Sequence, residues 1–279
     1  MPETAPPDRD VFAADLLAGQ VALVTGGGTG LGREIAGVLA RSGADLLLAG
    51  RRLEPLEETA RALAAASGRR IEVVQANIRD VDAVAALEER SRELFGGIDV
   101  LVNNAGGQFP QRARDISAKG WRAVVDTNLN GTWNMIQTFG RQMLERERRG
   151  SITNVVMVSG RGFPGLAHSA AARAGVIELS RTLAWEWGNR VRVNCVAPGP
   201  VITAGFEAAY DPAIVREMYK VPMQRFGSPR EVANAVVFLA SPAASWITGE
   251  LLQVAGGQHI YGSNQALFDG DFERDALPD

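Results

Sequence analysis

Cysteine and histidine are scarce in this chain of 279 residues. Cys195 is the only cysteine, so no disulfide can form within the chain. It lies in the apolar run 191–196, a setting more typical of a core residue than of a nucleophile. The only histidines are His168 and His259, which with one cysteine supply too few ligands for a zinc site. We therefore expect no metal cofactor.

Long hydrophobic runs and a surplus of one charge are also missing. No apolar run approaches the roughly 18 residues of a membrane span, and no charged segment followed by an apolar one opens the chain as in a secretory signal. The formal net charge of −3 offers no basic surplus for nucleic acid. Only two of the 29 basic residues are lysine, a bias typical of GC-rich bacterial genomes. We expect a soluble, cytoplasmic bacterial protein that binds neither nucleic acid nor membrane.

A glycine-rich turn joins the first predicted strand, 20–24, to the first predicted helix. Residues 25–32 read Thr-Gly-Gly-Gly-Thr-Gly-Leu-Gly and precede a helical pattern of apolar residues. Glycines let backbone amides approach a pyrophosphate, which the positive end of the helix also attracts. Because tight turns use the same residues, the turn alone leaves a dinucleotide site and a purely structural turn open. The candidate cofactor-binding residues here are Thr25, Gly26, Gly28, Thr29, Gly30, Leu31 and Gly32.

Two arginines follow the second predicted strand, 45–49. Arg51 and Arg52 lie about 20 residues beyond the last glycine, where a Rossmann fold places the residue that meets the adenosine ribose. An acidic residue there would bind the 2′-hydroxyl of NAD, whereas guanidinium groups suit the 2′-phosphate of NADP. The alternative is that both arginines only solvate the start of a helix over 53–66. We favour NADPH as the cofactor.

Strands and helices alternate along the rest of the chain. This alternation predicts one α/β domain with a Rossmann-like, doubly wound parallel sheet and helices on both faces. Further strands are expected at 71–75, 100–103, 152–158, 191–196 and 251–254, and helices at 81–95, about 120–148 and about 169–187. We expect a flexible segment over 1–18, the domain over 19–261 and an acidic tail over 262–279. Within the domain, the apolar, irregular stretch 200–225 reads as a substrate lid or, alternatively, as an ordinary surface helix.

Several spaced motifs occur in order along the chain. They are the glycine turn 25–32, Asn103-Asn104-Ala105-Gly106, Asn128 within Asp-Thr-Asn-Leu-Asn-Gly-Thr, Arg192-Val193-Asn194 and Pro198-Gly199. In these motifs the chain resembles the short-chain dehydrogenase/reductase superfamily over residues 19–260. The resemblance implies that the cofactor also contacts Asn77, Ile78, Asn104, Ala105, Gly106, Arg173, Pro198, Gly199, Val201 and Thr203.

Further motifs indicate a subgroup of that superfamily. They are Asn77-Ile78-Arg79, Gly107-Gln108-Phe109, Lys119-Gly120-Trp121, Gly162-Phe163-Pro164, His168-Ser169 and the stretches 171–176 and 241–245. In these the chain is similar to the peroxisomal trans-2-enoyl-CoA reductases and to their relatives, the 2,4-dienoyl-CoA reductases. It ends in Ala-Leu-Pro-Asp rather than in the peroxisomal signal of that subgroup.

The chain departs from the carbonyl-reducing members of the superfamily, which carry a tyrosine and, four residues later, a lysine. Alignment of 150–154 with the fifth strand of the family places Met157 at the usual serine, Ser169 at the tyrosine and Arg173 at the lysine. Only Asn128 remains of that tetrad. A phenol with a pKa of about 10 can protonate a forming alkoxide, which a serine hydroxyl cannot easily do. The hydride is therefore expected to add to a carbon of a conjugated double bond.

An enoyl thioester would explain these substitutions. Hydride adds to its β-carbon and charge moves to the thioester oxygen, where hydrogen bonds stabilise the enolate without full proton transfer. The Ser169 hydroxyl and the amides around Gly106 and Gly107 are candidate donors to that oxygen, and water is a candidate source of the final proton. Arg173, one helical turn after Ser169, is expected to hold the nicotinamide ribose as the lysine does in relatives. The expected catalytic residues are Asn128, Ser169 and Arg173, with a structural alternative for Asn128 as the residue that kinks its helix.

The candidate substrate contacts are Gly107, Gln108, Phe109, Ser159, His168 and Phe206. Gln108 and Phe109 follow a turn at the carboxyl end of a strand, the side on which such sheets bind ligands; the alternative is loop packing. Ser159 is a candidate substitute for the missing serine. His168 is either a proton shuttle or a cap of its helix.

We predict an NADPH-dependent reductase of the 2,3 double bond of enoyl thioesters, carried by CoA or by an acyl carrier protein. Two alternatives stay open: a carbonyl reductase with an unusual acid such as His168 or Ser159, and a non-catalytic NADP-binding scaffold. A homotetramer is expected, as in similar proteins, because two predicted helices carry apolar residues beyond one stripe. These residues are Trp121, Val124, Val125, Trp133, Met135, Ile136, Phe139, Leu183, Trp185 and Trp187.

Overall fold

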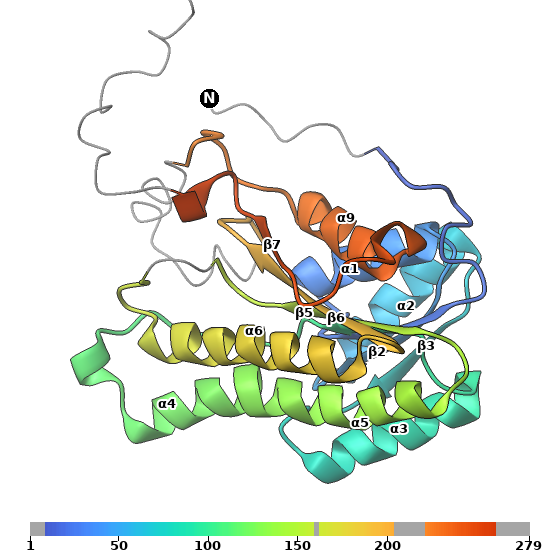
Figure 1. Ribbon diagram of the computed structural model, residues 1–279, viewed down its shortest axis with the longest axis horizontal. Coiled ribbons are helices and arrows are strands. Elements are labelled where there is room, and N and C mark those ends of the chain that lie inside the picture. Colours follow the sequence, from blue (N-terminus) through green and yellow to red (C-terminus); the bar gives the residue numbers. More distant parts are fainter. Residues whose placement is uncertain (1–8, 159–161, 204–220, 261–279) are drawn as a thin grey trace, which may run out of the picture.

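A seven-stranded sheet forms the centre of the protein. The computed structural model describes residues 9–158, 162–203 and 221–260. The strands of this sheet all run parallel, in the order β3-β2-β1-β4-β5-β6-β7 (Figure 1). They are β1 Val21–Thr25, β2 Asp45–Gly50, β3 Ile71–Gln75, β4 Val100–Asn103, β5 Gly150–Val155, β6 Val191–Pro198 and β7 Leu251–Val254. The strand order reverses direction between β1 and β4, so the carboxyl ends of these two strands flank the crevice in which such sheets bind ligands.

Helices cover both faces of this sheet, as Figure 1 shows. On one face lie α1 Gly30–Arg41, α2 Leu53–Ser67 and α9 Pro229–Ala240, and on the other lie α3 Val81–Phe95, α5 Gly131–Glu145 and α6 Ala167–Trp187. Each layer buries its own cluster of aliphatic side chains against the strands. The predicted doubly wound α/β fold is confirmed. None of the helices in the described ranges is both long enough and apolar enough to cross a membrane.

The region expected to form one helix over about 120–148 is interrupted. α4 Ala118–Val125 gives way to a π-helical turn over Asp126–Asn130, and α5 follows. π-turns inside helices are rare and recur at functional sites. The interruption falls on Asn128, whose side chain is fully buried, as the structural alternative for this residue anticipated.

The N-terminal segment is held more firmly than expected from residue 9 onward. Leu17 is fully buried, and its amide donates to the carbonyl of Ser42 at 2.7 Å. Arg41 and Arg230 each place a guanidinium nitrogen 3.0 Å from a carboxylate oxygen of Asp10. These contacts fix the segment against the layer of α1 and α9.

Candidate active site

The glycine turn connects the carboxyl end of β1 to α1. Gly26 has φ of +67°, a left-handed conformation that a side chain disfavours. A Cβ atom on Gly32 would lie 2.2 Å from the carbonyl oxygen of Gly26, so only glycine fits there. Thr29 precedes α1 without a side-chain cap, which leaves the first amides of the helix available to a phosphate.

The turn after β4 is bonded to the glycine turn. The Thr25 hydroxyl oxygen accepts from the amides of Asn104 and Ala105, at 3.0 Å each. The Asn104 side-chain amide donates to the Thr25 carbonyl at 2.9 Å. Two motifs that lie almost 80 residues apart in the sequence therefore form one rigid unit at the carboxyl ends of β1 and β4.

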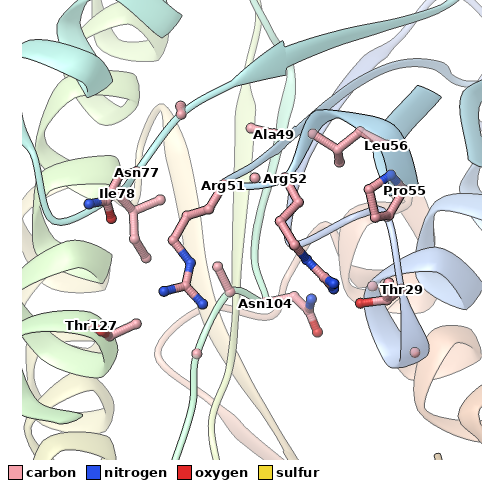
Figure 2. A pocket seen from close by; sticks show the side chains of 18 of the residues that line it. Thr29, Ala49, Arg51, Arg52, Pro55, Leu56, Asn77, Ile78, Asn104 and Thr127 are labelled. Atoms are coloured by element: carbon pink, nitrogen blue, oxygen red, sulfur yellow. The ribbon is translucent and has the colours of Figure 1, made fainter. Parts of the chain in front are cut away.

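A cleft of about 370 Å³ opens beside this unit. Figure 2 shows the side chains of Arg51 and Arg52 extending into this cleft. Asn77 and Ile78 lie on one side of the two arginines, and Thr29 lies on the other. None of the lining residues is acidic, and neither arginine forms an ion pair within the described part of the chain. The cleft thus combines glycine-exposed amides with free guanidinium groups, which suits a phosphorylated nucleotide.

Most of the predicted cofactor-binding residues line this cleft. They are Gly26, Gly28, Thr29, Gly30, Leu31, Gly32, Arg51, Arg52, Asn77, Ile78, Asn104, Ala105, Gly106 and Thr203. Five predicted residues do not line the cleft. Thr25 bonds to the turn after β4 instead, and the other four are Arg173, Pro198, Gly199 and Val201. Gly199 is packed instead against Ala255, where a Cβ would meet the backbone at 2.7 Å.

Seven lining residues were not predicted. They are Ala49, Gly50, Pro55, Leu56, Ala76, Arg79 and Thr127. Arg79 carries the one clear chemical signal among them, since it follows the predicted Asn77-Ile78 pair directly. Its guanidinium lies 3.7 Å from the Asp126 carboxylate, so part of its charge is offset.

Asn128, Gly106 and Arg173 meet at one point. A Cβ atom on Gly106 would lie 2.2 Å from an Arg173 guanidinium nitrogen and 2.9 Å from the Asn128 side-chain oxygen. Asn128 also clamps the backbone of Gly107: its oxygen accepts from that amide at 3.0 Å, and its nitrogen donates to that carbonyl at 2.9 Å. The π-turn therefore anchors the strand-end turn that borders the cleft.

Arg173 is half-buried, and its guanidinium group points into the protein interior. Burial lowers the pKa of its guanidinium to about 10, so the group remains charged at neutral pH. It donates to the carbonyl of Val155 at the end of β5, at 2.9 Å. A buried positive charge with one carbonyl partner favours a nearby ligand oxygen or developing negative charge.

Ser169, one turn before Arg173 in α6, is also fully buried. Its hydroxyl donates to the side-chain oxygen of Gln108 at 2.6 Å, and the Met157 sulfur lies 3.9 Å from the same hydroxyl. The residues aligned with the family's serine and tyrosine thus lie side by side. Neither offers a group that titrates as a phenol does.

His168 precedes Ser169 at the start of α6 and has no exposed surface. Its ring packs edge-on against Phe109, with centroids 4.6 Å apart, and its Nδ1 accepts from the Ser169 amide at 2.8 Å. The predicted substrate residues Gly107, Gln108, Phe109 and His168 are therefore gathered around Ser169. Ser159, Phe206 and most of the predicted lid, 204–220, lie outside the described residues.

Comparisons with known proteins agree with this architecture. A family model described as enoyl-(acyl carrier protein) reductase matches residues 26–259. The peroxisomal 2,4-dienoyl-CoA reductase of Danio rerio is 36% identical, over 91% of this chain and 86% of that protein. A 3-oxoacyl-[acyl-carrier-protein] reductase of Chlamydia muridarum is also 36% identical, over 87% of this chain and 98% of that protein.

A solved structure has the same fold as this chain. The citronellol catabolism dehydrogenase of Pseudomonas aeruginosa superposes with a TM-score of 0.79 at 39% identity, covering 88% of this chain and 97% of that one. Together with the glycine turn and the cleft, these likenesses confirm the resemblance that the motifs indicated. The chain therefore belongs to the short-chain dehydrogenase/reductase superfamily, as an oxidoreductase that uses a nicotinamide cofactor.

Proposed function

We propose that this protein reduces the 2,3 double bond of enoyl thioesters with NADPH. The observation that carries the proposal is the pairing of a complete nucleotide cleft with a site in which Ser169 and Met157 replace the residues of carbonyl reduction. The relative from Danio rerio is named as a 2,4-dienoyl-CoA reductase, which supports a thioester with a conjugated double bond. The carrier is CoA or an acyl carrier protein.

NADPH as the cofactor is supported by the cleft itself. The glycine turn and the start of α1 would hold the pyrophosphate, and Arg51 and Arg52 would hold the 2′-phosphate. Arg173 and Asn128 lie around Gly106, where they would face the nicotinamide ribose. When bound, the cofactor supplies the hydride that adds to the β-carbon of the substrate.

The protein's part is to stabilise charge at the other end of the conjugated system. As the β-carbon gains hydride, negative charge develops on the thioester oxygen, and the Arg173 guanidinium favours it across the low-dielectric interior. No protein acid has to transfer a proton to that oxygen. A water molecule supplies the proton that completes the α-carbon.

Loss of NADPH absorbance tests the proposal directly. Crotonyl-CoA and 2,4-hexadienoyl-CoA are the enoyl substrates, and acetoacetyl-CoA is the ketone control. We expect turnover with crotonyl-CoA and little with the ketone. Turnover of 2,4-hexadienoyl-CoA alone would contradict reduction of the 2,3 double bond, because a 3-enoyl product has gained its hydride beyond that bond. Turnover of the ketone alone would assign a carbonyl reductase, and binding of NADPH without turnover of any of the three would assign a non-catalytic scaffold.

Ser169 is expected to contribute modestly. Ser169→Ala removes one hydrogen bond, to Gln108, and should lower kcat/KM with crotonyl-CoA by up to about tenfold. Ser169→Tyr should not improve the reaction, because a phenol at this fully buried position would displace the Gln108 and Met157 side chains that contact the hydroxyl. Steady-state rates of both variants provide the measurement; complete loss of turnover in Ser169→Ala would make Ser169 the essential acid.

We also propose a homotetramer, although fewer apolar residues are exposed for subunit contacts than the sequence indicated. Val124, Met135, Ile136, Phe139 and Leu183 are buried within the chain's own core and call for no partner. Of the predicted residues, Trp185 is 91% and Trp121 is 41% exposed, and Trp246, which was not predicted, is 98% exposed. Such surfaces are typical of subunit contacts.

Light scattering at micromolar concentration should report the mass of four chains of 29.8 kDa each. Replacing Trp185 and Trp246 together with glutamate should reduce that mass, because charge in a subunit contact is unfavourable. The matched control is Val11→Glu, at an exposed apolar residue of the N-terminal segment. A wild-type monomer would contradict the assembly.

A further inference from the structure

Two of the donors expected for the thioester oxygen, the Ser169 hydroxyl and the Gly107 amide, are already engaged. The Ser169 hydroxyl has a single proton, which it donates to Gln108 at 2.6 Å. The Gly107 amide donates to the Asn128 side-chain oxygen at 3.0 Å. An enolate oxygen that develops beside Ser169 therefore cannot accept from either of these two groups while their present hydrogen bonds are kept.

His168 lies at the same place and is fully buried. It is the chain neighbour of Ser169 and contacts Phe109, whereas Ser169 contacts the adjacent Gln108. Both side chains thus border the turn that follows β4. The edge-on contact with Phe109 and the bond from the Ser169 amide fix the orientation of the imidazole ring.

The bonding of the ring determines which nitrogen carries its proton. Because Nδ1 accepts from the Ser169 amide, Nδ1 has no proton, and a neutral imidazole then carries its proton on Nε2. Nε2 is buried and has no hydrogen-bond partner within the described ranges. An unpaired buried donor is unfavourable, and native proteins that retain one commonly do so for a function.

We propose that the Nε2–H group of His168 donates a hydrogen bond to the thioester oxygen of the bound acyl substrate. This inference rests on the proposed function and names a donor to the enolate oxygen. The imidazole stays neutral and keeps its proton, so no bond to hydrogen is broken in this step. A neutral imidazole at the start of a helix can polarise a carbonyl in this way.

Two variants separate this role from a structural one. His168→Asn keeps an acceptor near the position of Nδ1 for the Ser169 amide but has no donor at the position of Nε2. His168→Gln places an amide donor near the position of Nε2 and loses the acceptor. We expect His168→Asn to lower kcat with crotonyl-CoA about a hundredfold, as for the removal of one donor to an oxyanion, with the melting temperature unchanged.

His168→Gln should show the opposite pattern. It should keep at least about ten times the kcat of His168→Asn, because it retains one donor to the oxyanion. It should melt at a lower temperature, because the Ser169 amide has lost its acceptor. A purely structural His168 predicts the reverse order, with His168→Gln the more damaged enzyme. Equal rates for the two variants, or wild-type kcat in His168→Asn, would overturn the proposal.

Infrared spectroscopy reports the hydrogen bond without turnover. Crotonyl-CoA labelled with ¹³C at the thioester carbon is bound to the enzyme with NADP⁺, which cannot donate hydride. The carbonyl band should shift to lower frequency in the wild type and in His168→Gln, and should return toward the free value in His168→Asn. If the band in His168→Asn is the same as in the wild type, and the wild type turns over normally, the role of His168 is overturned and the proposed function stands. Failure of the wild type to bind or reduce either enoyl-CoA removes the proposed function and this inference with it.

Discussion

Replacing Arg173 with methionine is expected to lower kcat/KM for enoyl-CoA reduction by about a hundredfold or more. Removal of one preorganised charge-stabilising group from an oxyanion site costs on the order of 10²–10³ in rate. Arg173 is half-buried beside Gly106 and Asn128, so solvent can replace its charge only in part. Methionine retains most of the length of the side chain, which separates loss of charge from loss of packing.

Arg173→Lys is the matched variant, because it keeps a positive charge at the position where the family carries lysine. It should recover part of the rate that Arg173→Met loses, though its single nitrogen cannot bond to the Val155 carbonyl and to a ligand in the same fork geometry. Steady-state kinetics, NADPH titration and circular dichroism of both variants provide the measurements. A nearly silent Arg173→Met would show that the charge is not used in the reaction.

Local patterns were sufficient to predict the sheet and the nucleotide cleft. Gly26 and Gly32 mark their turn because a side chain is disfavoured at Gly26 and has no room at Gly32, and that constraint is visible in one short stretch. Strands β3, β4 and β7 have the predicted bounds, since short apolar runs between turns leave little freedom. The two arginines in the cleft followed from their spacing to the last glycine.

α9 was not predicted, although the sequence contained a signal for it. Ser228 caps this helix and exchanges hydrogen bonds with Glu231 three residues later, and Pro229 occupies the first helical position. This capping box is readable from sequence. The break at Asn128 had no local signal of this kind and was anticipated only through the alternative role given to Asn128. The hydrogen bond of Asn128 to the backbone of Gly107, 21 residues away, is not visible in a local pattern.

The contacts within the candidate site were beyond sequence reasoning for the same physical reason. Ser169 and Gln108 lie 61 residues apart, and only the contact of the start of α6 with the loop after β4 brings them together. Which partner covers an apolar helix face is equally invisible to periodicity. Phe139 was expected to contribute to a subunit contact, but it is buried against this chain's own sheet.

Replacing Arg51 and Arg52 together with alanine is expected to change the cofactor preference of the enzyme. Each charge-assisted hydrogen bond to a phosphate contributes about 1.5–3 kcal/mol, and each 1.4 kcal/mol corresponds to roughly a tenfold change in affinity. The double variant should therefore bind NADPH about 10² to 10⁴ times more weakly. The affinity for NADH should stay nearly unchanged, since NADH has no 2′-phosphate for the guanidinium groups to meet.

Fluorescence titration of both cofactors measures the two affinities. Arg61→Ala is the control, because Arg61 is an exposed arginine of α2 that does not line the cleft. It removes a charge of the same sign and should leave both affinities unchanged, which separates a specific phosphate contact from a general electrostatic effect. Equal losses for NADPH and NADH in the double variant would mean that Arg51 and Arg52 act on a part shared by both cofactors, the adenine or the pyrophosphate. NADPH and NADH differ only in the 2′-phosphate, and the cleft has no acidic lining residue that would bind the ribose 2′-hydroxyl of NADH. A loss of affinity for NADPH alone would therefore assign both guanidinium groups to the 2′-phosphate.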